Sequence, residues 1–282
     1  AKMYDADWEG PHLIWPPYMR GAVEKGILTS RQAHQIRAQY GAKLTMIDAW
    51  LGRVLDAIER NNLWANTAVI LCTDHGHYLG EKDIWGKPGV PIYDTLGRIP
   101  LLIAWPGQQQ RDIDALTTSV DLHATLADVF GVTMRQRTHG RSLLPLIEST
   151  ATSVRDYTLM GVWGRQVHIT DGRWKYVRGP AARNEPLAMY SNRWSTMPTH
   201  VLPREQELPL PDDRATLARM PGSKVPVIKQ VWTAADALPF WAWARAEDNV
   251  NRLFDTGNDP SETEEHQGTA HEKRMTEMLH EL

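Results

Sequence analysis

The sequence predicts an α/β fold that gives way, in its second half, to a smaller antiparallel subdomain. Three observations support this prediction. A stretch with helical spacing of apolar residues, 36–58, precedes the short apolar run 67–72, and a second apolar run follows at 99–105. A helix next to buried strands is the usual crossover of a parallel sheet. Beyond about residue 150, two strand-like segments instead flank a tight-turn signal, which indicates antiparallel pairing.

The first predicted helix has a recognisable start and end. Thr29 and Gln32 have the spacing of a capping box, in which the first side chain caps the helix and the second reaches back to it. Apolar residues then recur every three or four positions up to Ile58, and the Asn pair at 61–62 is expected to end the helix. The segment 1–28 has several Pro and Gly residues without a clear period, so it is predicted to be a loop.

Two short runs are predicted to form buried strands. The run 67–72 (TAVILC) contains β-branched and apolar residues and neither Pro nor Gly. The run 99–105 (IPLLIAW) is similar and is followed by Pro106 and Gly107, which are expected to stop the strand. With the preceding helix, these runs predict part of a parallel α/β sheet.

The remaining sequence predicts a change of architecture. Asp121 is expected to cap a short helix that Gly131 ends. Strand-like segments then flank Asp171-Gly172, a strong hairpin signal. We therefore predict a boundary near Thr150, with 1–150 as the α/β part and 151–282 as the antiparallel α+β subdomain. The latter would include a Pro- and Trp-rich insertion at about 180–245 and a charged terminal helix within 262–282.

The composition excludes some functions. Of the 282 residues, 42% are hydrophobic and 23% are charged, as in ordinary globular proteins. The net charge of −3 gives no reason to expect a nucleic-acid partner. No apolar run reaches the length of a membrane span, and the first twenty residues lack the features of a signal peptide. The localisation stays unassigned, because the native N-terminus is expected to be missing from this chain.

Polar side chains cluster where the run 67–72 ends. Asp74 and His75 are adjacent, and Lys87 follows in a loop with several glycines. Ligands bind beyond the carboxyl ends of strands in open α/β sheets. A carboxylate suits a hard dication, and an imidazole shifts the preference from calcium toward manganese or zinc. Alternatively, Asp74 only caps backbone amides, His77 is a surface or supporting group, and Lys82 and Lys87 are solvated.

Several short motifs follow one another on both sides of this loop. They are DHG at 74–76, LG at 79–80, IWGK at 84–87, YD at 93–94, RIPL at 98–101, PG at 106–107, VDL at 120–122, HGRSL at 139–143, LFD at 253–255 and NDP at 258–260. Their order and spacing resemble those of the sulfatases of the alkaline-phosphatase-like superfamily, over roughly residues 30–178 and 250–265. The resemblance implies that this chain holds part of an alkaline-phosphatase-like parallel-sheet core.

The resemblance also implies roles for individual residues. Asp74 and His75 match ligands of one divalent metal ion, with calcium, manganese and zinc not distinguished. Lys87 matches the lysine that contacts the sulfate group and stabilises the departing oxygen, so it is the candidate catalytic and substrate-binding residue. His77, where the family commonly has Glu, is a weaker substrate-binding candidate. The implied substrate is a small-molecule sulfate ester.

Two alternative functions stay open. The Asp-His pair also occurs in phosphonate monoester hydrolases and their relatives, so the chain could belong to a phosphonate monoester or phosphodiester hydrolase. It could also be a non-catalytic binding or structural module.

The nucleophile of the family is absent from this sequence. Sulfatases use a formylglycine made from the Cys or Ser of a C-x-P-x-R motif, which normally lies upstream of the Asp-His pair. Cys72 is the only cysteine, and the residues that follow it do not match this motif. We therefore expect the C-terminal portion of a sulfatase, inactive alone; a natural protein that lost its nucleophile is the alternative. Without the early strands, the sheet would expose an apolar edge and associate with the N-terminal portion or with a second copy.

Overall fold

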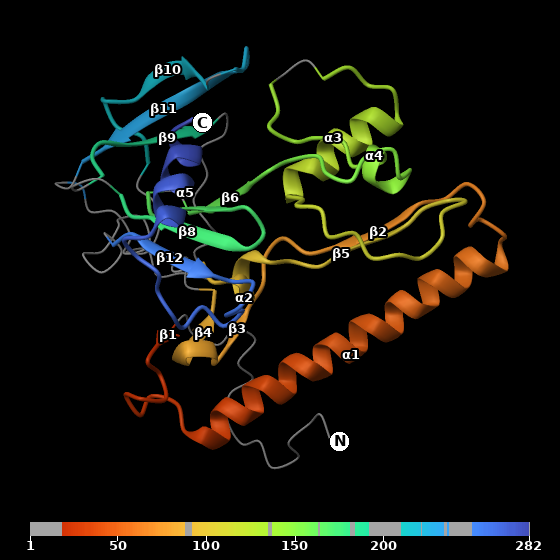
Figure 1. Cartoon of the computed structure of the whole chain (residues 1–282), viewed down its shortest axis with the longest axis horizontal. Helices are drawn as coiled ribbons and strands as arrows, with labels where there is room; N and C mark the ends of the chain where they lie inside the picture. Colours follow the sequence, from red (N-terminus) through yellow and green to blue (C-terminus); the bar gives the residue numbers. More distant parts are fainter. Residues whose placement is uncertain are drawn as a thin grey trace. The chain divides into compact units, whose positions relative to one another are not determined.

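The computed structural model describes residues 19–87, 92–134, 137–162, 164–180, 184–191, 210–220, 222–233, 236 and 250–281. The chain forms two compact units, whose helices and strands are labelled in Figure 1. The first unit comprises Ala1–Pro88 and Tyr93–Asp112, and the second comprises Gly89–Ile92 and Ile113–Leu282. This division falls near Asp112, whereas the domain assignment 1–150 and 151–282 stays a prediction.

The first helix has the predicted start and end. Helix α1 spans Ser30–Arg60 and begins with a complete capping box: the Thr29 hydroxyl accepts from the Gln32 amide at 3.2 Å, and Oε1 of Gln32 accepts from the Thr29 amide at 2.9 Å. Asn61 caps the other end, and Asn62 has a left-handed φ of 53°. The local sequence signals therefore determined this helix correctly.

The two predicted strands form, but they do not pair in parallel. Strand β2 (Val69–Cys72) pairs with β5 (Leu101–Ala104) antiparallel, with Val69 opposite Ala104. All pairs between described strands are antiparallel, which corrects the expected parallel sheet for this part of the chain. In the described part of the chain between β2 and β5, the α-helix is the one-turn α2 (Asp94–Gly97), which is shorter than the usual crossover helix between parallel strands.

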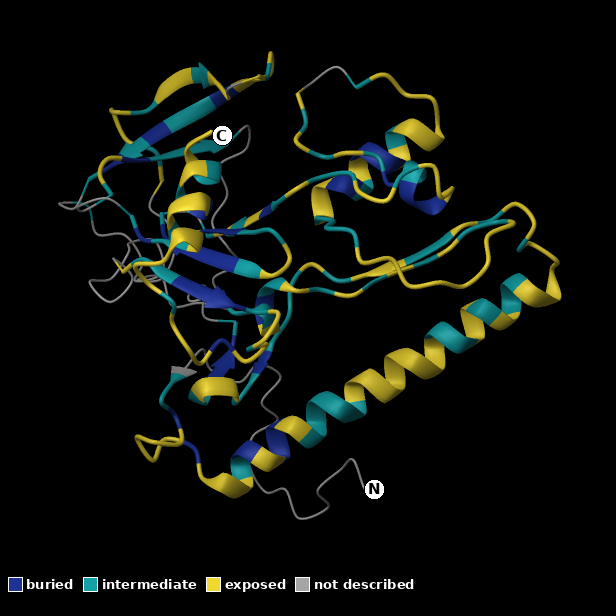
Figure 2. Cartoon of the chain, in the orientation of Figure 1, coloured by how far each residue is buried: buried dark blue, intermediate teal, exposed yellow. Residues whose placement is uncertain are grey.

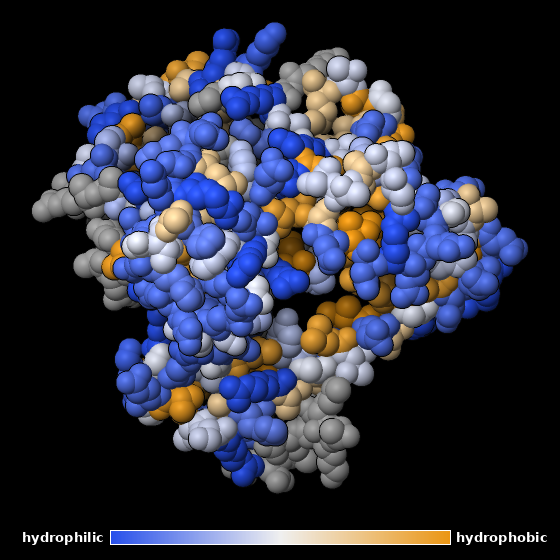
Figure 3. Space-filling view, viewed as in Figure 1, coloured by the Kyte–Doolittle hydropathy of each residue, from blue (hydrophilic) through white to orange (hydrophobic). Residues whose placement is uncertain are grey.

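The strands predicted to be buried are instead partly exposed. Leu71 of β2 is 41% exposed and Leu102 of β5 is 58% exposed. Along α1, the buried residues lie near its start, at Ala33, Gln35 and Ile36, whereas most of the following turns are exposed or half-buried (Figure 2). Apolar side chains gather on the surface along α1 and over β2 and β5 (Figure 3). The large exposed apolar residues of α1 are Leu44, Met46, Ile47, Trp50 and Val54.

A small antiparallel sheet and its core lie at the start of α1. The strand order is β1-β4-β3, and the short 3₁₀ helix η1 connects β3 to β4. The first turns of α1 pack against Trp85 of β4, which is 1% exposed, together with Ala22 and Leu28. This packing fixes β4, the strand that leads directly into Lys87. The bounds are β1 Met19–Arg20, β3 Tyr78–Leu79, η1 Glu81–Asp83 and β4 Ile84–Gly86.

In the second unit, the helix predicted near residue 121 starts earlier than expected. Helix α3 spans Ser119–Val129 with Thr118 as its cap, and Asp121 is the third helical residue. The prediction of Asp121 as the cap was wrong, because its buried carboxylate has other partners. It accepts from the amides of Thr118 and Arg141, each at 2.8 Å, and forms an ion pair with Arg155. Helix α4 (Leu144–Ile147) follows.

An antiparallel sheet of order β12-β8-β7-β6 forms the centre of the second unit. The hairpin at Asp171-Gly172 is confirmed, since Gly172 has a φ of 95° and joins β7 to β8. Met275 of the terminal helix α5 is fully buried in the core with Ile169 and Leu253. The terminal helix, predicted to be charged and solvated, therefore also packs into the core. The bounds are β6 Thr158–Gly161, β7 Val167–Thr170, β8 Trp174–Arg178, β12 Arg252–Asp255 and α5 Ala270–His280.

The predicted insertion at 180–245 contains regular structure. Three strands within it pair antiparallel in the order β10-β11-β9, and the rest of the insertion lies largely outside the described residues. Among the described residues, no helix combines the length and the apolar character needed to cross a membrane. The bounds are β9 Leu187–Ser191, β10 Thr216–Arg219 and β11 Pro226–Trp232.

Candidate active site

Asp74 and His75 lie together just beyond β2, where the sequence predicted them. The Asp74 carboxylate accepts from the backbone amide of His75 at 2.9 Å, and its second oxygen lies 3.2 Å from Nε2 of the His75 ring. The Asp74 side chain is 81% exposed and the His75 side chain is 34% exposed. A carboxylate and an imidazole therefore face solvent side by side.

The hydrogen bonds of His75 determine which ring nitrogen is free to accept. Nδ1 lies 2.8 Å from the carbonyl oxygen of Gly76, and a carbonyl can only accept, so Nδ1 carries the proton. Nε2 then presents a lone pair, and the Lys87 ammonium lies 2.8 Å from it as a donor. Two of the predicted site residues, Asp74 and Lys87, thus lie close to the Nε2 atom of the third, His75.

Electrostatics favour the ionised form of Asp74. Desolvation acts to raise the pKa of the Asp74 carboxyl, but the neighbouring His75, backbone hydrogen bonds and the Lys87 charge outweigh it and lower this pKa. A carboxylate that stays ionised is suited to bind a cation.

His77 lies in a different environment from these three residues. Its ring stacks on Tyr40 of α1, with ring centroids 5.5 Å apart and planes at 21°. Burial lowers the pKa of the His77 imidazole, and the neighbouring His75 and Lys87 act in the same direction. A neutral, stacked ring is a poor partner for an anionic group, so the substrate-binding role of His77 stays the weakest of the site predictions.

The donors present fit part of a divalent metal site. The described residues contain no group of three or more His, Cys, Asp and Glu side chains that could hold an ion. Asp74 and His75 alone supply an oxygen and a nitrogen, whereas zinc sites use about four ligands and calcium sites about six to eight. Further donors would have to come from elsewhere.

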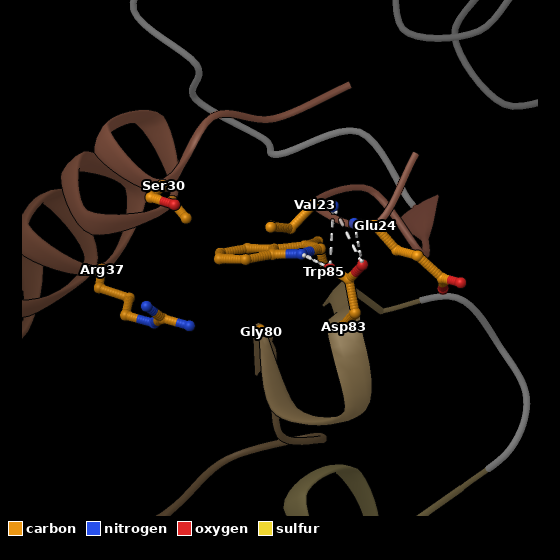
Figure 4. Close-up of a pocket in the computed structure, with 8 residues that line it drawn as sticks. Val23, Glu24, Ser30, Arg37, Gly80, Asp83 and Trp85 are labelled. Atoms are coloured by element: carbon orange, nitrogen blue, oxygen red, sulfur yellow. Dashed lines mark hydrogen bonds between the residues drawn. The ribbon is translucent and has the colours of Figure 1, made fainter. Parts of the chain in front are cut away.

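A network around Asp83 fixes the strand before Lys87 (Figure 4). The Asp83 carboxylate accepts from the amides of Val23 and Glu24 at 3.0 Å and from Nε1 of Trp85 at 2.8 Å. The Arg37 guanidinium lies 5.1 Å from the Trp85 ring centroid. These groups line a shallow cavity of about 350 Å³, together with Ser30, Ala33 and Gly80. The Asp83 oxygens are occupied by donors within the chain, and none of the residues that line this cavity is a predicted site residue.

Comparison with solved structures establishes the fold class. One structure, described as being "in complex with its substrate D-Glucosamine-2-N, 6-O-disulfate", aligns with a TM-score of 0.56 at 18% identity, over 93% of this chain and 44% of that chain. The chain therefore has the α/β fold of the alkaline-phosphatase-like class, as the motifs implied.

Sequence comparison shows similarity to sulfatases. The family model Sulfatase matches residues 2–132. The choline-sulfatase of Rhizobium meliloti (strain 1021) is 31% identical over 156 residues, which is 53% of this chain and 30% of the relative. The multifunctional alkaline phosphatase superfamily protein PehA of Trinickia caryophylli is 31% identical over 140 residues, 48% of this chain and 27% of the relative. The chain is thus similar to sulfatases over its first half and spans less than a third of the length of either relative.

Proposed function

We propose that this chain contributes a metal-binding pair and a sulfate-contacting lysine to a sulfuric ester hydrolase. The observation that carries the proposal is the convergence of Asp74 and Lys87 on Nε2 of His75, at 3.2 and 2.8 Å. The similarity to sulfatases supports hydrolysis of a sulfate ester as the reaction. The substrate would be a small-molecule sulfate ester.

Each residue has a chemical role in this proposal. Asp74 and Nε2 of His75 would hold one divalent ion, which could be calcium, manganese or zinc and which would replace the hydrogen bond from Lys87 to Nε2. When bound, such an ion polarises the sulfate oxygens. The Lys87 ammonium would oppose the negative charge that grows on the departing oxygen, an interaction that is strongest in the transition state. A formylglycine nucleophile would come from a segment outside these 282 residues, because they contain no C-x-P-x-R motif.

The metal-binding role can be tested on the chain itself. Titration calorimetry with calcium, manganese and zinc should show binding that Asp74→Ala abolishes and Asp48→Ala, a change on the exposed face of α1, preserves. Equal binding by the Asp74→Ala variant would contradict the proposed ligand. Such a result would favour the alternative of a non-catalytic binding or structural module.

We also propose that the isolated chain is inactive and associates through its apolar surface. The missing motif supports the first part, and the exposed apolar residues of α1, β2 and β5 support the second. The partner would be the N-terminal portion of a sulfatase or a second copy of this chain. Multiple turnovers of an aryl sulfate by the pure chain would contradict inactivity, and a monodisperse monomer in light scattering would contradict association.

A phosphonate monoester or phosphodiester hydrolase is the second candidate. The Asp-His pair and the similarity to the PehA protein favour it. Matched aryl sulfate, phosphonate and phosphodiester substrates, offered to a nucleophile-containing form of the protein, distinguish the two. A higher kcat/KM for the phosphonate or the diester would replace the sulfatase assignment.

A further inference from the structure

The hairpin between His75 and Lys87 is held against helix α1 at two places. Its strands β3 and β4 pair antiparallel, with Tyr78 opposite Gly86, so the residues just outside this pair are His77 and Lys87. These residues and α1 all belong to the first unit. Because Lys87 directly follows the last residue of β4, the position of the hairpin determines where the backbone of Lys87 begins.

Arg37 of α1 makes the first of these contacts. Its Nε donates a 2.7 Å hydrogen bond to the Leu79 carbonyl of β3, and its guanidinium lies over the Trp85 ring of β4, 5.1 Å from the ring centroid. Leu79 and Trp85 are opposite each other in the hairpin, so one side chain of the helix contacts both strands. Figure 4 shows the guanidinium directed from α1 toward Trp85 and Gly80.

Gly80 leaves the space that this contact needs. Its φ of 110° lies in the left-handed region that favours glycine. A Cβ atom added there would lie 2.3 Å from Nη2 of Arg37 and 2.7 Å from the Trp85 ring. Both distances are well below the optimal separation of non-bonded atoms, so a larger residue would displace the guanidinium. The contact of Arg37 with the hairpin therefore depends on a glycine at this position.

Tyr40 makes the second contact, three residues after Arg37. Its ring stacks on the His77 ring, with centroids 5.5 Å apart. Residues three apart are neighbours on the surface of a helix, so both contacts come from the same side of α1. Together they hold both strands of the hairpin and the residue directly before β3.

We propose that Arg37 and Tyr40 are positioning residues for the contact between Lys87 and His75. This proposal rests on the roles proposed above for Lys87 and His75. The 2.8 Å bond between them joins a residue after β4 to a residue before β3, so it depends on how firmly the hairpin is held. A group that acts in a transition state loses much of its effect when it is displaced by about 1 Å.

Hydrogen exchange of the full chain tests the Arg37 contact. Arg37→Lys keeps the charge but loses the Nε bond and the planar group. Arg53→Lys is the matched control, because the Arg53 guanidinium also lies over a tryptophan ring, 4.2 Å from the Trp50 centroid, later on the same helix. Exchange at the Gly80 amide, which bonds to the Ile84 carbonyl, should become about tenfold faster in Arg37→Lys and stay unchanged in the control. Equal exchange in the two variants would overturn the Arg37 contact.

Two variants of Tyr40 test the stacking contact. Tyr40→Phe keeps an aromatic ring and should keep wild-type exchange across β3 and β4. Tyr40→Leu removes the stacking partner of His77 and should raise this exchange about threefold. The same exchange rates in both variants would remove Tyr40 from the proposal.

The chemical reactivity of Lys87 tests whether the hairpin sets its position. Competitive acylation of the full chain, read by mass spectrometry, compares Lys87 with the exposed Lys273 in each variant. Loosening the contact with His75 should make Lys87 react about fivefold faster in Arg37→Lys, whereas Arg53→Lys should match the wild type. Faster exchange at Gly80 with unchanged reactivity of Lys87 would show a purely structural contact and overturn the positioning role.

Kinetics separate this proposal from the proposed function. In a nucleophile-containing form of the protein, Arg37→Lys should lower kcat with little change in KM, and should add nothing to the effect of Lys87→Ala. Additive effects would overturn positioning through Lys87. If Lys87→Ala leaves kcat unchanged, the role of Lys87 has failed, and exchange and acylation still decide whether Arg37 and Tyr40 set its contact with His75.

Discussion

The ammonium group of Lys87 lies 2.8 Å from Nε2 of His75, so it donates a hydrogen bond to the lone pair of the imidazole ring, just beyond β2. In the proposed reaction this lysine acts on the departing oxygen. The contact therefore links the residue that would bind metal to the one that would assist bond cleavage.

Replacing Lys87 by Ala should slow the chemical step. We expect kcat for an aryl sulfate to fall about 10²-fold or more in a nucleophile-containing form, with a smaller change in KM, because the lost interaction strengthens in the transition state. Steady-state and single-turnover kinetics measure this effect, and Lys273→Ala on the exposed face of α5 is the control. An unchanged kcat, with chemistry shown to limit the rate, would remove Lys87 from the mechanism.

The buried carboxylate of Asp121 should be important for stability. Asp121→Ala leaves Arg155, whose side chain is 10% exposed, without its partner and frees two backbone amides. We expect the free energy of unfolding to fall by about 3–5 kcal/mol. Urea denaturation measures the change, and the exposed Asp128→Ala on the same helix should cost little. A loss below about 1 kcal/mol would show that the ion pair is dispensable.

His168 should make stability depend on pH. Burial, assisted by the charge of Lys175, lowers the pKa of the His168 imidazole to about 3. In the unfolded state the pKa of this imidazole is about 6.5. Above that pH, His168 is neutral in both the folded and the unfolded state, so it does not reduce the free energy of unfolding. As the pH falls from about 6.5 toward 3, only the unfolded state gains the proton, so stability falls by up to about 1.4 kcal/mol per pH unit.

Urea denaturation across this pH range measures the effect of His168. Its ring nitrogens have no hydrogen-bond partner within the described part of the chain, so His168→Leu should fold and show a shallower pH dependence. The exposed His123→Leu on α3 should keep the wild-type slope. The same slope in both variants would assign the pH dependence to other groups.

The apolar surface of α1 should drive association of the isolated chain. Ile47 and Trp50 are 55% and 58% exposed. Replacing both by Ser should weaken association about tenfold or more, since burial of one such side chain contributes about 1.5–3 kcal/mol. Sedimentation over a range of concentrations measures the effect, and Asp48→Asn on the same helix is the control. Identical association of the two variants would place the contact elsewhere.

Local signals in the sequence predicted local structure well. The capping box of Thr29 and Gln32 and the hairpin at Asp171-Gly172 both formed, because each depends on bonds between residues close in the chain. The adjacency of Asp74 and His75 also follows from sequence. The resemblance assigned Lys87 a role at the same site, but its contact with His75, twelve residues earlier in the chain, was not predicted.

Long-range pairing was harder to predict. The apolar runs that form β2 and β5 carry no information on direction, so their antiparallel pairing could not be read from composition. Asp121 looked like a helix cap, yet its carboxylate also binds the distant Arg141 and Arg155.

Helix α1 is continuous, but its first turns pack against a buried core and its later turns are largely exposed. Its early residues Ala33 and Ile36 belong to a core with Trp85, whereas Trp50 and Val54 are more than half exposed. Isolated helices gain little stability from propensity alone, so the later turns of the unassociated chain should open far more often than the first ones. One uninterrupted helix thus contains two thermodynamic segments, and a gradient of amide protection along it would report whether its apolar face is covered.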